Sequence, residues 1–87
     1  MAQMTEMDIK SKLREFLKNN FLLGNDSGLN DDDSFMSKGI VDSTGILEVV
    51  SFVEQNFGFR VEDEELIPDN LDSINNLVKY ITKKQVS

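Results

Sequence analysis

The sequence predicts an all-α protein, a four-helix bundle of three longer helices and one short helix, with a long loop between the first two helices. Three stretches place apolar residues at helical spacing, and a residue that caps helices well precedes each of them. No segment repeats another, and 39% hydrophobic residues in a chain of 87 suffice for one modest core. We therefore expect a single domain over 1–87, with its core at about 5–83.

The first helix is expected to run from about Glu6 to Asn20. Thr5 is suited to the N-cap position, and Gly24 ends the apolar run. One face of this helix is apolar at the spacing i, i+4, i+7, i+8. This face consists of Ile9, Leu13, Phe16 and Leu17.

A polar loop is expected to follow over 24–41. Connections in compact domains usually take about 4–6 residues, so a loop of this length is either functional or mobile. Its apolar residues are expected to anchor it to the core. These residues are Phe35, Met36, Ile40 and Val41.

The second helix is expected to start at Asp42, a good N-cap residue, and to end at Phe57, with Gly58 as the C′ residue. Its β-branched residues make a strand the competing interpretation for 46–53, but the cap, the helical spacing and the terminal glycine favour a helix. Its buried stripe consists of Ile46, Val49, Val50, Val53 and Phe57.

The short helix or turn is expected from Glu62 to Leu66, ending before Pro68, and Ser73 is expected to cap the last helix. The apolar face of that helix consists of Ile74, Leu77, Val78 and Ile81. The predicted core as a whole comprises Ile9, Leu13, Phe16, Val49, Val50, Val53, Phe57, Leu66, Ile74, Leu77 and Ile81.

The composition excludes several classes of function. Sixteen acidic residues against nine basic ones give a net charge of −7, which disfavours nucleic acid and anionic membranes and favours basic protein partners. The chain contains no cysteine and no histidine, so disulfides, thiolate metal sites and Ser-His-Asp arrangements are impossible. We therefore expect a protein that is not an enzyme and holds no metal.

Targeting signals are absent from the pattern as well. The start has no basic segment followed by an apolar one, and no apolar run approaches the ~20 residues of a membrane span. These features predict a cytoplasmic protein without membrane insertion, and we also expect a monomer.

Ser43 is the residue to which the pattern draws attention. If Asp42 caps the second helix, Ser43 takes the first helical position with its hydroxyl toward solvent. The start of a helix carries partial positive charge and unpaired N–H groups, which suit an attached phosphate. Residues 42–72 contain nine acidic residues against Arg60 alone, so the acidity is concentrated just downstream.

Four stretches together resemble the acyl carrier protein family, in its free-standing form. The run 32–43 resembles the family's acidic loop and Asp-Ser modification site, and 48–58 resembles its second helix. Residues 61–66 resemble its acidic third helix, and 71–81 its closing helix. The resemblance covers about residues 5–83 and follows the family's order and spacing.

The resemblance implies that Ser43, with Asp42 beside it, carries a covalent 4'-phosphopantetheine arm. A phosphopantetheinyl transferase would supply this arm from coenzyme A. Its terminal thiol would hold acyl groups as thioesters, so the chemistry is delegated to a group carrier. The acyl groups would be delivered to separate acyl-loading, condensing or transferring enzymes of fatty-acid or specialised natural-product biosynthesis.

The partner enzymes are expected to dock through basic patches onto acidic and apolar residues that follow Ser43. The expected docking residues are Thr44, Leu47, Glu48, Glu54, Glu62, Asp63, Glu64 and Glu65. Thr44 departs from the Leu or Met common in the family, and Gly45 is expected to loosen the first turn of the helix. These departures favour a dedicated carrier over a housekeeping one.

Three alternatives stay open. An aminoacyl carrier of the D-alanyl or peptidyl type differs only in its cargo, and Asp42 in place of His leans toward acyl cargo. An acidic helical interaction module would never be modified at Ser43. A calcium site at 30–33 lacks the alternating ligands, central glycine and terminal Glu of an EF-hand, so a solvated acidic loop is favoured.

Overall fold

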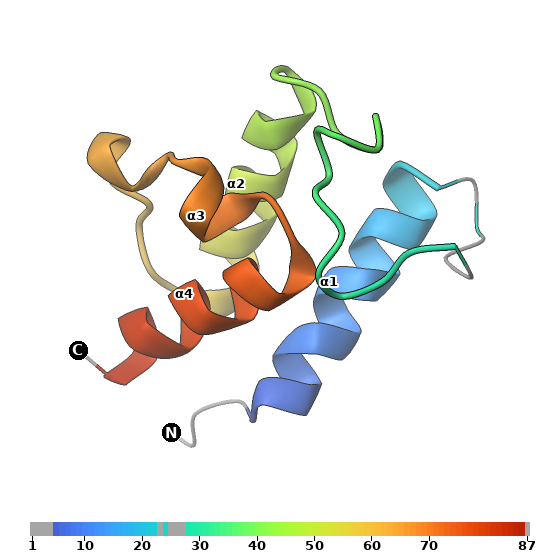
Figure 1. Cartoon of the computed structure of the whole chain (residues 1–87). Helices are drawn as coiled ribbons and strands as arrows, with labels where there is room; N and C mark the ends of the chain where they lie inside the picture. Colours follow the sequence, from blue (N-terminus) through green and yellow to red (C-terminus); the bar gives the residue numbers. More distant parts are fainter. Residues whose placement is uncertain (1–4, 23, 25–27, 87) are drawn as a thin grey trace.

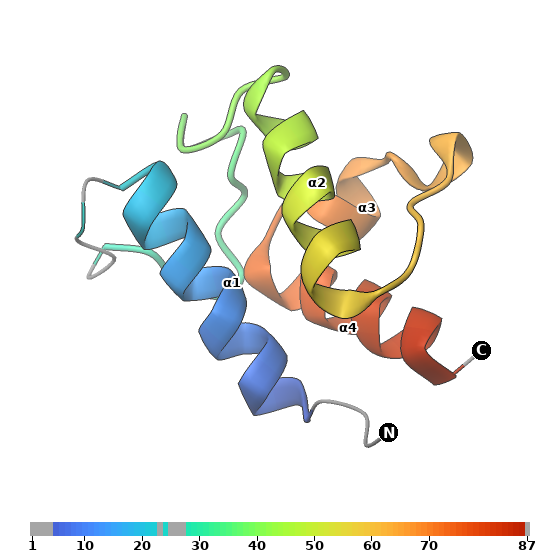
Figure 2. The ribbon, with the colours of Figure 1, turned by 180° about the vertical axis from the view of Figure 1, so that it is seen from behind.

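The computed structural model describes residues 5–22, 24 and 28–86, and within them it confirms the all-α prediction. In chain order the elements are α1 (Glu6–Asn20), α2 (Gly45–Phe57), the 3-10 turn η1 (Asp63–Glu65), α3 (Pro68–Leu71) and α4 (Ile74–Val86). Opposite views place α2 between α1 and α3 (Figure 1 and Figure 2), and α4 packs against the other three helices.

The first helix has the predicted bounds and the predicted cap. The Thr5 hydroxyl accepts a hydrogen bond from the Asp8 N–H at 3.2 Å, which satisfies one of the free donors of the first turn. Ile9, Leu13 and Leu17 are fully buried, and this face packs against α4. The apolar spacing therefore identified the buried face of α1.

The second helix ends as predicted. Gly58 has a φ of +76°, in the left-handed region that favours glycine, and its N–H donates to the Glu54 carbonyl at 3.2 Å. The predicted start was wrong, because the regular helix begins at Gly45, three residues after Asp42. Ser43 therefore lies in the turn two residues before the helix and not at its first position. Asp42 nevertheless holds this turn through its carboxylate.

The short helix or turn predicted over 62–66 is present as η1 at 63–65, but the short α-helix α3 was not predicted. It begins at Pro68, where the sequence predicted a stop. Proline lacks an N–H, but the first position of a helix needs none, and the fixed φ of proline suits that position. Leu66, predicted in the core, is 39% exposed because it lies between these two short elements.

The core otherwise follows the apolar stripes. Of the predicted core residues, Phe16, Val50 and Phe57 are only partly buried and pack against the core from outside. The predicted residues that are buried are Ile9, Leu13, Val49, Val53, Ile74, Leu77 and Ile81. Further buried residues come from the connections and from α1, α3 and α4, namely Leu17, Leu29, Phe35, Val41, Val61, Leu71, Val78 and Tyr80.

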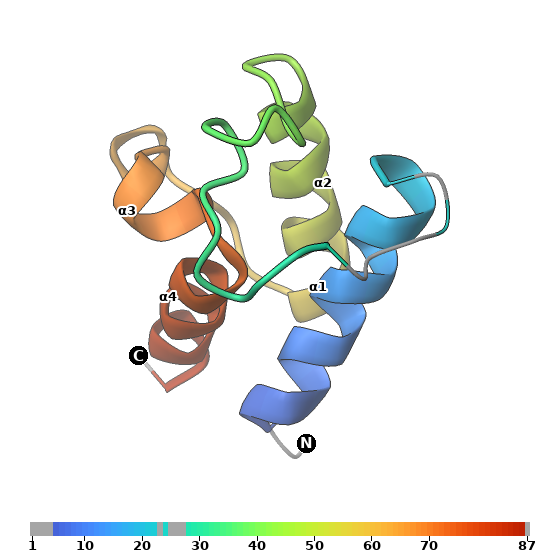
Figure 3. The same cartoon turned by 45° about the vertical axis from the view of Figure 1, so that its right-hand side comes forward.

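The connection from α1 to α2 crosses the molecule beside the start of α4 (Figure 3). The Phe35 N–H donates to the Asp72 carbonyl at 2.8 Å, and the Asn75 N–H donates to the Asp31 carbonyl at 3.0 Å. Phe35 and Val41 are buried, as predicted for anchors. Of the other two predicted anchors, Ile40 is partly buried and packs against the core, whereas Met36 is 50% exposed.

Candidate functional site

The start of α2 presents Ser43 to solvent. One oxygen of the Asp42 carboxylate accepts from the Gly45 N–H at 2.6 Å, and the Asp42 carbonyl accepts from the Ile46 N–H at 3.0 Å. Asp42 therefore caps this turn with both its side chain and its carbonyl, as predicted. Ser43 is exposed, beside the positive end of a helix of 13 residues.

Gly45 lies where the end of α1 and the following loop come close to the first turn of α2. The residue is buried, and a Cβ placed on it would lie 3.0 Å from a Phe21 ring carbon and 3.2 Å from a Val41 methyl carbon. Real Cβ atoms rarely come so close to a neighbour, so the glycine lets the end of α1 and the loop meet α2. A side chain at position 45 would therefore push α2 away from Phe21 and Val41.

An apolar cavity of about 150 Å³ adjoins Ser43 on the side of α3. Ser43 and Leu47 contribute from the start of α2, and Leu66 and Ile67 contribute from the connection that follows η1. The remaining lining residues are Met36, Ile46, Pro68, Leu71 and Asp72. An apolar group tethered near Ser43 would find shelter from water here.

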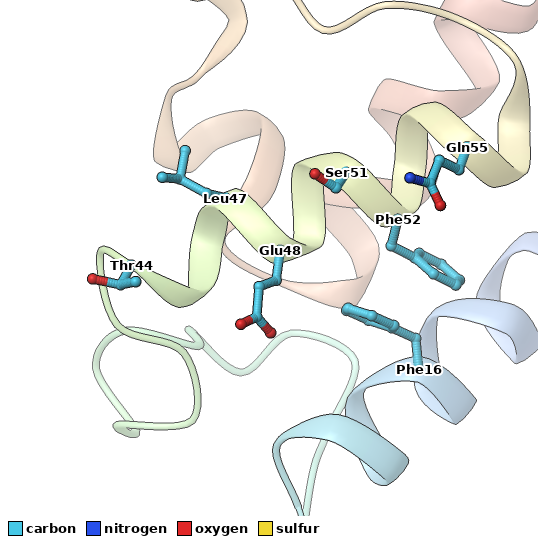
Figure 4. Close-up of a pocket in the computed structure, with 7 residues that line it drawn as sticks. All are labelled: Phe16, Thr44, Leu47, Glu48, Ser51, Phe52 and Gln55. Atoms are coloured by element: carbon cyan, nitrogen blue, oxygen red, sulfur yellow. The ribbon is translucent and has the colours of Figure 1, made fainter.

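A wider groove of about 480 Å³ lies on the neighbouring face of α2, toward α1, and Leu47 lines both the groove and the cavity. Figure 4 shows Phe16 and Phe52 facing each other across the two helices, and their ring centroids are 4.2 Å apart in a stacked arrangement. The predicted docking residues Thr44, Leu47 and Glu48 all line this groove. Ser51 and Gln55 complete it.

Two of the predicted docking acids bond within the protein. Glu54 accepts from the Val61 N–H at 2.9 Å, so it fixes the chain that leaves α2. Glu65 accepts from the Tyr80 hydroxyl at 3.0 Å and from the Lys84 ammonium at 3.1 Å. The Glu62 N–H, followed by Lys84 and Tyr80, holds the pKa of Glu65 below its usual value.

The other acids near α2 stay on the surface. Glu48, Glu62, Asp63 and Glu64 are all exposed, and Leu47, next to Glu48 in α2, is 59% exposed. A surface with an exposed apolar side chain and exposed carboxylates suits a partner with an apolar contact and basic side chains. Of the predicted set, the structure brings Thr44, Leu47 and Glu48 together in the groove.

Sequence reasoning missed the aromatic floor of the groove and part of the cavity wall. Phe52 lies off the buried stripe, but it stands four residues after Glu48, and the two share one helix face. This spacing was a usable signal for Phe52. The roles of Phe16, Met36 and Ile67 depend on contacts between separate elements, which no local pattern reveals.

The acidic residues of the run 30–33 form ion pairs that hold the loop. Asp31 pairs with Lys10 at 2.9 Å and with Arg14 at 2.8 Å, and Lys10 is the main cause that lowers the pKa of Asp31. Asp33 pairs with Lys38 at 3.2 Å. Within residues 5–22, 24 and 28–86, no group of three or more acidic side chains is arranged to hold a metal ion.

The described part of the chain also contains no helix with the length and apolar character to cross a membrane.

The fold is shared with a chain of known structure. A chain in a crystal structure of an FAD-dependent dehydrogenase superposes with a TM-score of 0.70 at 22% identity, covering 79% of this chain and 97% of that one. At this identity the likeness concerns the fold and nothing else.

Sequence comparisons identify the family. The model for the phosphopantetheine attachment site matches residues 8–81. An acyl carrier protein of Lactobacillus acidophilus is 27% identical, over 94% of this chain and 99% of its own length. A D-alanyl carrier protein of Streptococcus sanguinis is 31% identical, over 88% and 95%. A probable acyl carrier protein of Serratia, PigG, is 27% identical, over 86% of each chain.

The chain therefore belongs to the family of phosphopantetheine-binding carrier proteins, which confirms the resemblance seen in the sequence. Members of this family bear a covalently attached 4'-phosphopantetheine group. They are carriers rather than catalysts and work with biosynthetic enzymes.

Proposed function

We propose that Ser43 is the residue that bears the phosphopantetheine arm. The observation that supports this most strongly is the exposed Ser43 at the capped start of α2, beside an apolar cavity. The Ser43 oxygen would form the new bond to phosphorus, and the bond from that phosphorus to the adenosine bisphosphate of coenzyme A would break. A phosphopantetheinyl transferase would take the serine proton, because this chain offers no histidine base.

The proposed cargo is an acyl group held as a thioester on the arm. Two relatives bear acyl carrier names and Asp42 precedes Ser43, which supports acyl cargo. The D-alanyl carrier relative keeps an aminoacyl cargo as the second candidate. In either case the chain is proposed to act as one cytoplasmic, monomeric carrier domain that is not itself an enzyme, since the thiol belongs to the arm.

The proposed docking surface combines the outer face of α2 with the exposed acids of the next connection. Leu47 would enter an apolar recess of the partner, while basic side chains would face the surrounding carboxylates. The directly contacting residues would be Thr44, Leu47, Glu48, Glu62, Asp63 and Glu64. Glu54 and Glu65 would support this surface from within, because their carboxylates hold the connection in place.

Intact-protein mass spectrometry tests the proposal. The protein is incubated with coenzyme A, Mg²⁺ and a phosphopantetheinyl transferase of broad specificity, beside the variants Ser43→Ala and Ser37→Ala. We expect the native chain and Ser37→Ala to gain the mass of one phosphopantetheine and Ser43→Ala to gain none. A gain by Ser43→Ala would move the attachment to another residue.

No gain by any chain, with several transferases, would instead favour the unmodified interaction module. If the native chain does gain the arm, loading it with acyl groups and with D-alanine, each with its own ligase, separates the two cargo classes.

A further inference from the structure

Glu65 joins the connection after α2 to the last helix. Its carboxylate accepts from the Tyr80 hydroxyl at 3.0 Å and from the Lys84 ammonium at 3.1 and 3.2 Å, so both of its oxygens are used. It also accepts from the Glu62 N–H at 3.0 Å, closing a capping box around η1. One side chain therefore both stabilises the turn and attaches it to α4.

The partners of Glu65 are themselves held in place. Tyr80 is buried, and its ring meets the Phe59 ring edge to face at 5.6 Å between centroids. The Lys84 ammonium lies 5.8 Å from the centre of the same Phe59 ring. Burial, followed by the hydrogen bond to Glu65, raises the pKa of Tyr80, so its hydroxyl keeps the proton that it donates.

The chain directly after Glu65 forms a wall of the cavity beside Ser43. Leu66 and Ile67 line that cavity and are 39% and 43% exposed, so apolar burial holds them only weakly. The nearest buried residues along the chain are Val61 before them and Leu71 after them. Between these two points the segment depends on polar contacts for its position.

Those polar contacts lead mainly to Glu65 and to α4. The Ile67 N–H donates to the Glu65 carbonyl at 2.9 Å, and the side-chain amide of Asn70 donates to the same carbonyl at 3.0 Å. In α4, the side-chain amide of Asn76 donates to the Pro68 carbonyl at 3.2 Å. Hydrogen bonds near solvent open far more readily than a buried core, so this wall is the side of the cavity that is easiest to move.

We propose that Glu65 is a positioning residue for the cargo. Through Tyr80 and Lys84 it holds Leu66 and Ile67 at a set distance from α2, and this distance selects the length of acyl chain that the cavity beside Ser43 shelters. The inference rests on the proposed function and deepens it, because it gives an inward role to a residue that the sequence placed among the docking acids.

Hydrogen exchange on the unmodified protein tests the attachment itself. The double variant Tyr80→Phe, Lys84→Met removes both partners in α4 and leaves η1 untouched, and Lys83→Met is the matched control on an exposed neighbour. We expect amide exchange at Leu66 and Ile67 to become about five- to tenfold faster in the double variant, the effect of losing one to two hydrogen bonds. Unchanged exchange at these amides would overturn the proposal.

Thioester cleavage tests the role in cargo positioning. The modified proteins are loaded with saturated acyl chains of increasing length, and cleavage by hydroxylamine is followed by mass. We expect the slowest cleavage to move to a longer chain in the double variant and to stay in place in Lys83→Met. Faster amide exchange with an unshifted length profile would also overturn the proposal.

A failure of this inference and a failure of the proposed function give different results. If the double variant does not fold, Lys84→Met alone is measured in the same two assays, with a smaller shift expected in the same direction. If the native chain gains no phosphopantetheine, the proposed function fails and this inference with it. A native chain that is modified but has no length preference refutes the inference alone.

Discussion

The two connections that flank α2 are fixed in opposite ways. Residues 28–41, before α2, bury Leu29 and Phe35 and end in buried Val41. Residues 58–71, after α2, bury only the valine and leucine near their ends and leave their middle open beside the cavity. The first connection behaves as part of the core, although it has little regular structure, whereas the second depends on carboxylates and amides.

This difference separates a fixed side of the site from an adjustable one. The first connection delivers the capping Asp42, which must stay in place to present the start of α2. The second provides the cavity wall at Leu66 and Ile67, where movement would admit or exclude an apolar group. Elements with little apolar burial open locally at low cost, so motion is expected after α2 and not before it.

Phe35→Ala gives the largest effect expected from this contrast. The ring is fully buried, and its loss leaves a cavity in the core, so the free energy of unfolding should fall by about 3–5 kcal/mol. Leu66→Ala, in the second connection, should change it by less than about 1 kcal/mol, because this side chain is 39% exposed. Urea unfolding followed by circular dichroism measures both, and equal losses would remove the distinction between the connections.

Asp72→Ala tests the polar part of the first connection and should have an intermediate effect. The Asp72 carboxylate accepts from the Ser34 hydroxyl and, at 3.1 Å, from the Met36 N–H, so alanine leaves both donors without this partner. The free energy of unfolding should fall by about 1–2 kcal/mol. Amide exchange should rise at Met36 and stay unchanged at Leu66 and Ile67. A rise confined to those two residues would contradict the assignment.

The smallest expected effect is the contribution of the Asp31 charge to the free energy of unfolding, which depends on pH. Lys10, and after it Arg14, lowers the pKa of Asp31 below 3.8, so the folded state binds this proton less readily than the unfolded state. The resulting stability is complete above pH 3.8 and is lost as the pH falls through the lowered value. Because the pair is partly exposed, the loss should be less than about 1 kcal/mol.

The measurement compares thermal unfolding of the native chain and Asp31→Asn between neutral pH and pH 2. The stability difference between them should shrink as the pH falls. A difference independent of pH would show that the Asp31 charge does not support the loop.

The sequence predicted the fold wherever periodicity and caps act locally. Each of the three predicted caps accepts a backbone N–H through its side chain: Thr5, Asp42 and Ser73. The Ser73 hydroxyl accepts from the Asn76 N–H at 3.0 Å. The error at Pro68 has a physical cause, because proline both ends and begins helices, and only the packing of α3 on α4 decides between the two.

The candidate site was predictable as a position but not as a shape. Ser43 and its cap follow from one short run of sequence, yet the cavity and groove are formed by residues far apart in the chain, such as Phe16 with Phe52. The acids show the same limit. Composition marks Glu48 and Glu65 alike, and only the distance to Tyr80 and Lys84 reveals that Glu65 faces inward.

The orientation of the helices has a practical consequence. Helix α1 begins and α4 ends at one end of the molecule, while α2 begins at the other (Figure 1). A fluorophore or a surface linker attached near the start of α1 or the end of α4 would therefore lie away from the start of α2. The protein can therefore be immobilised on a sensor chip through either terminus. Ser43 then stays accessible to candidate enzymes in solution.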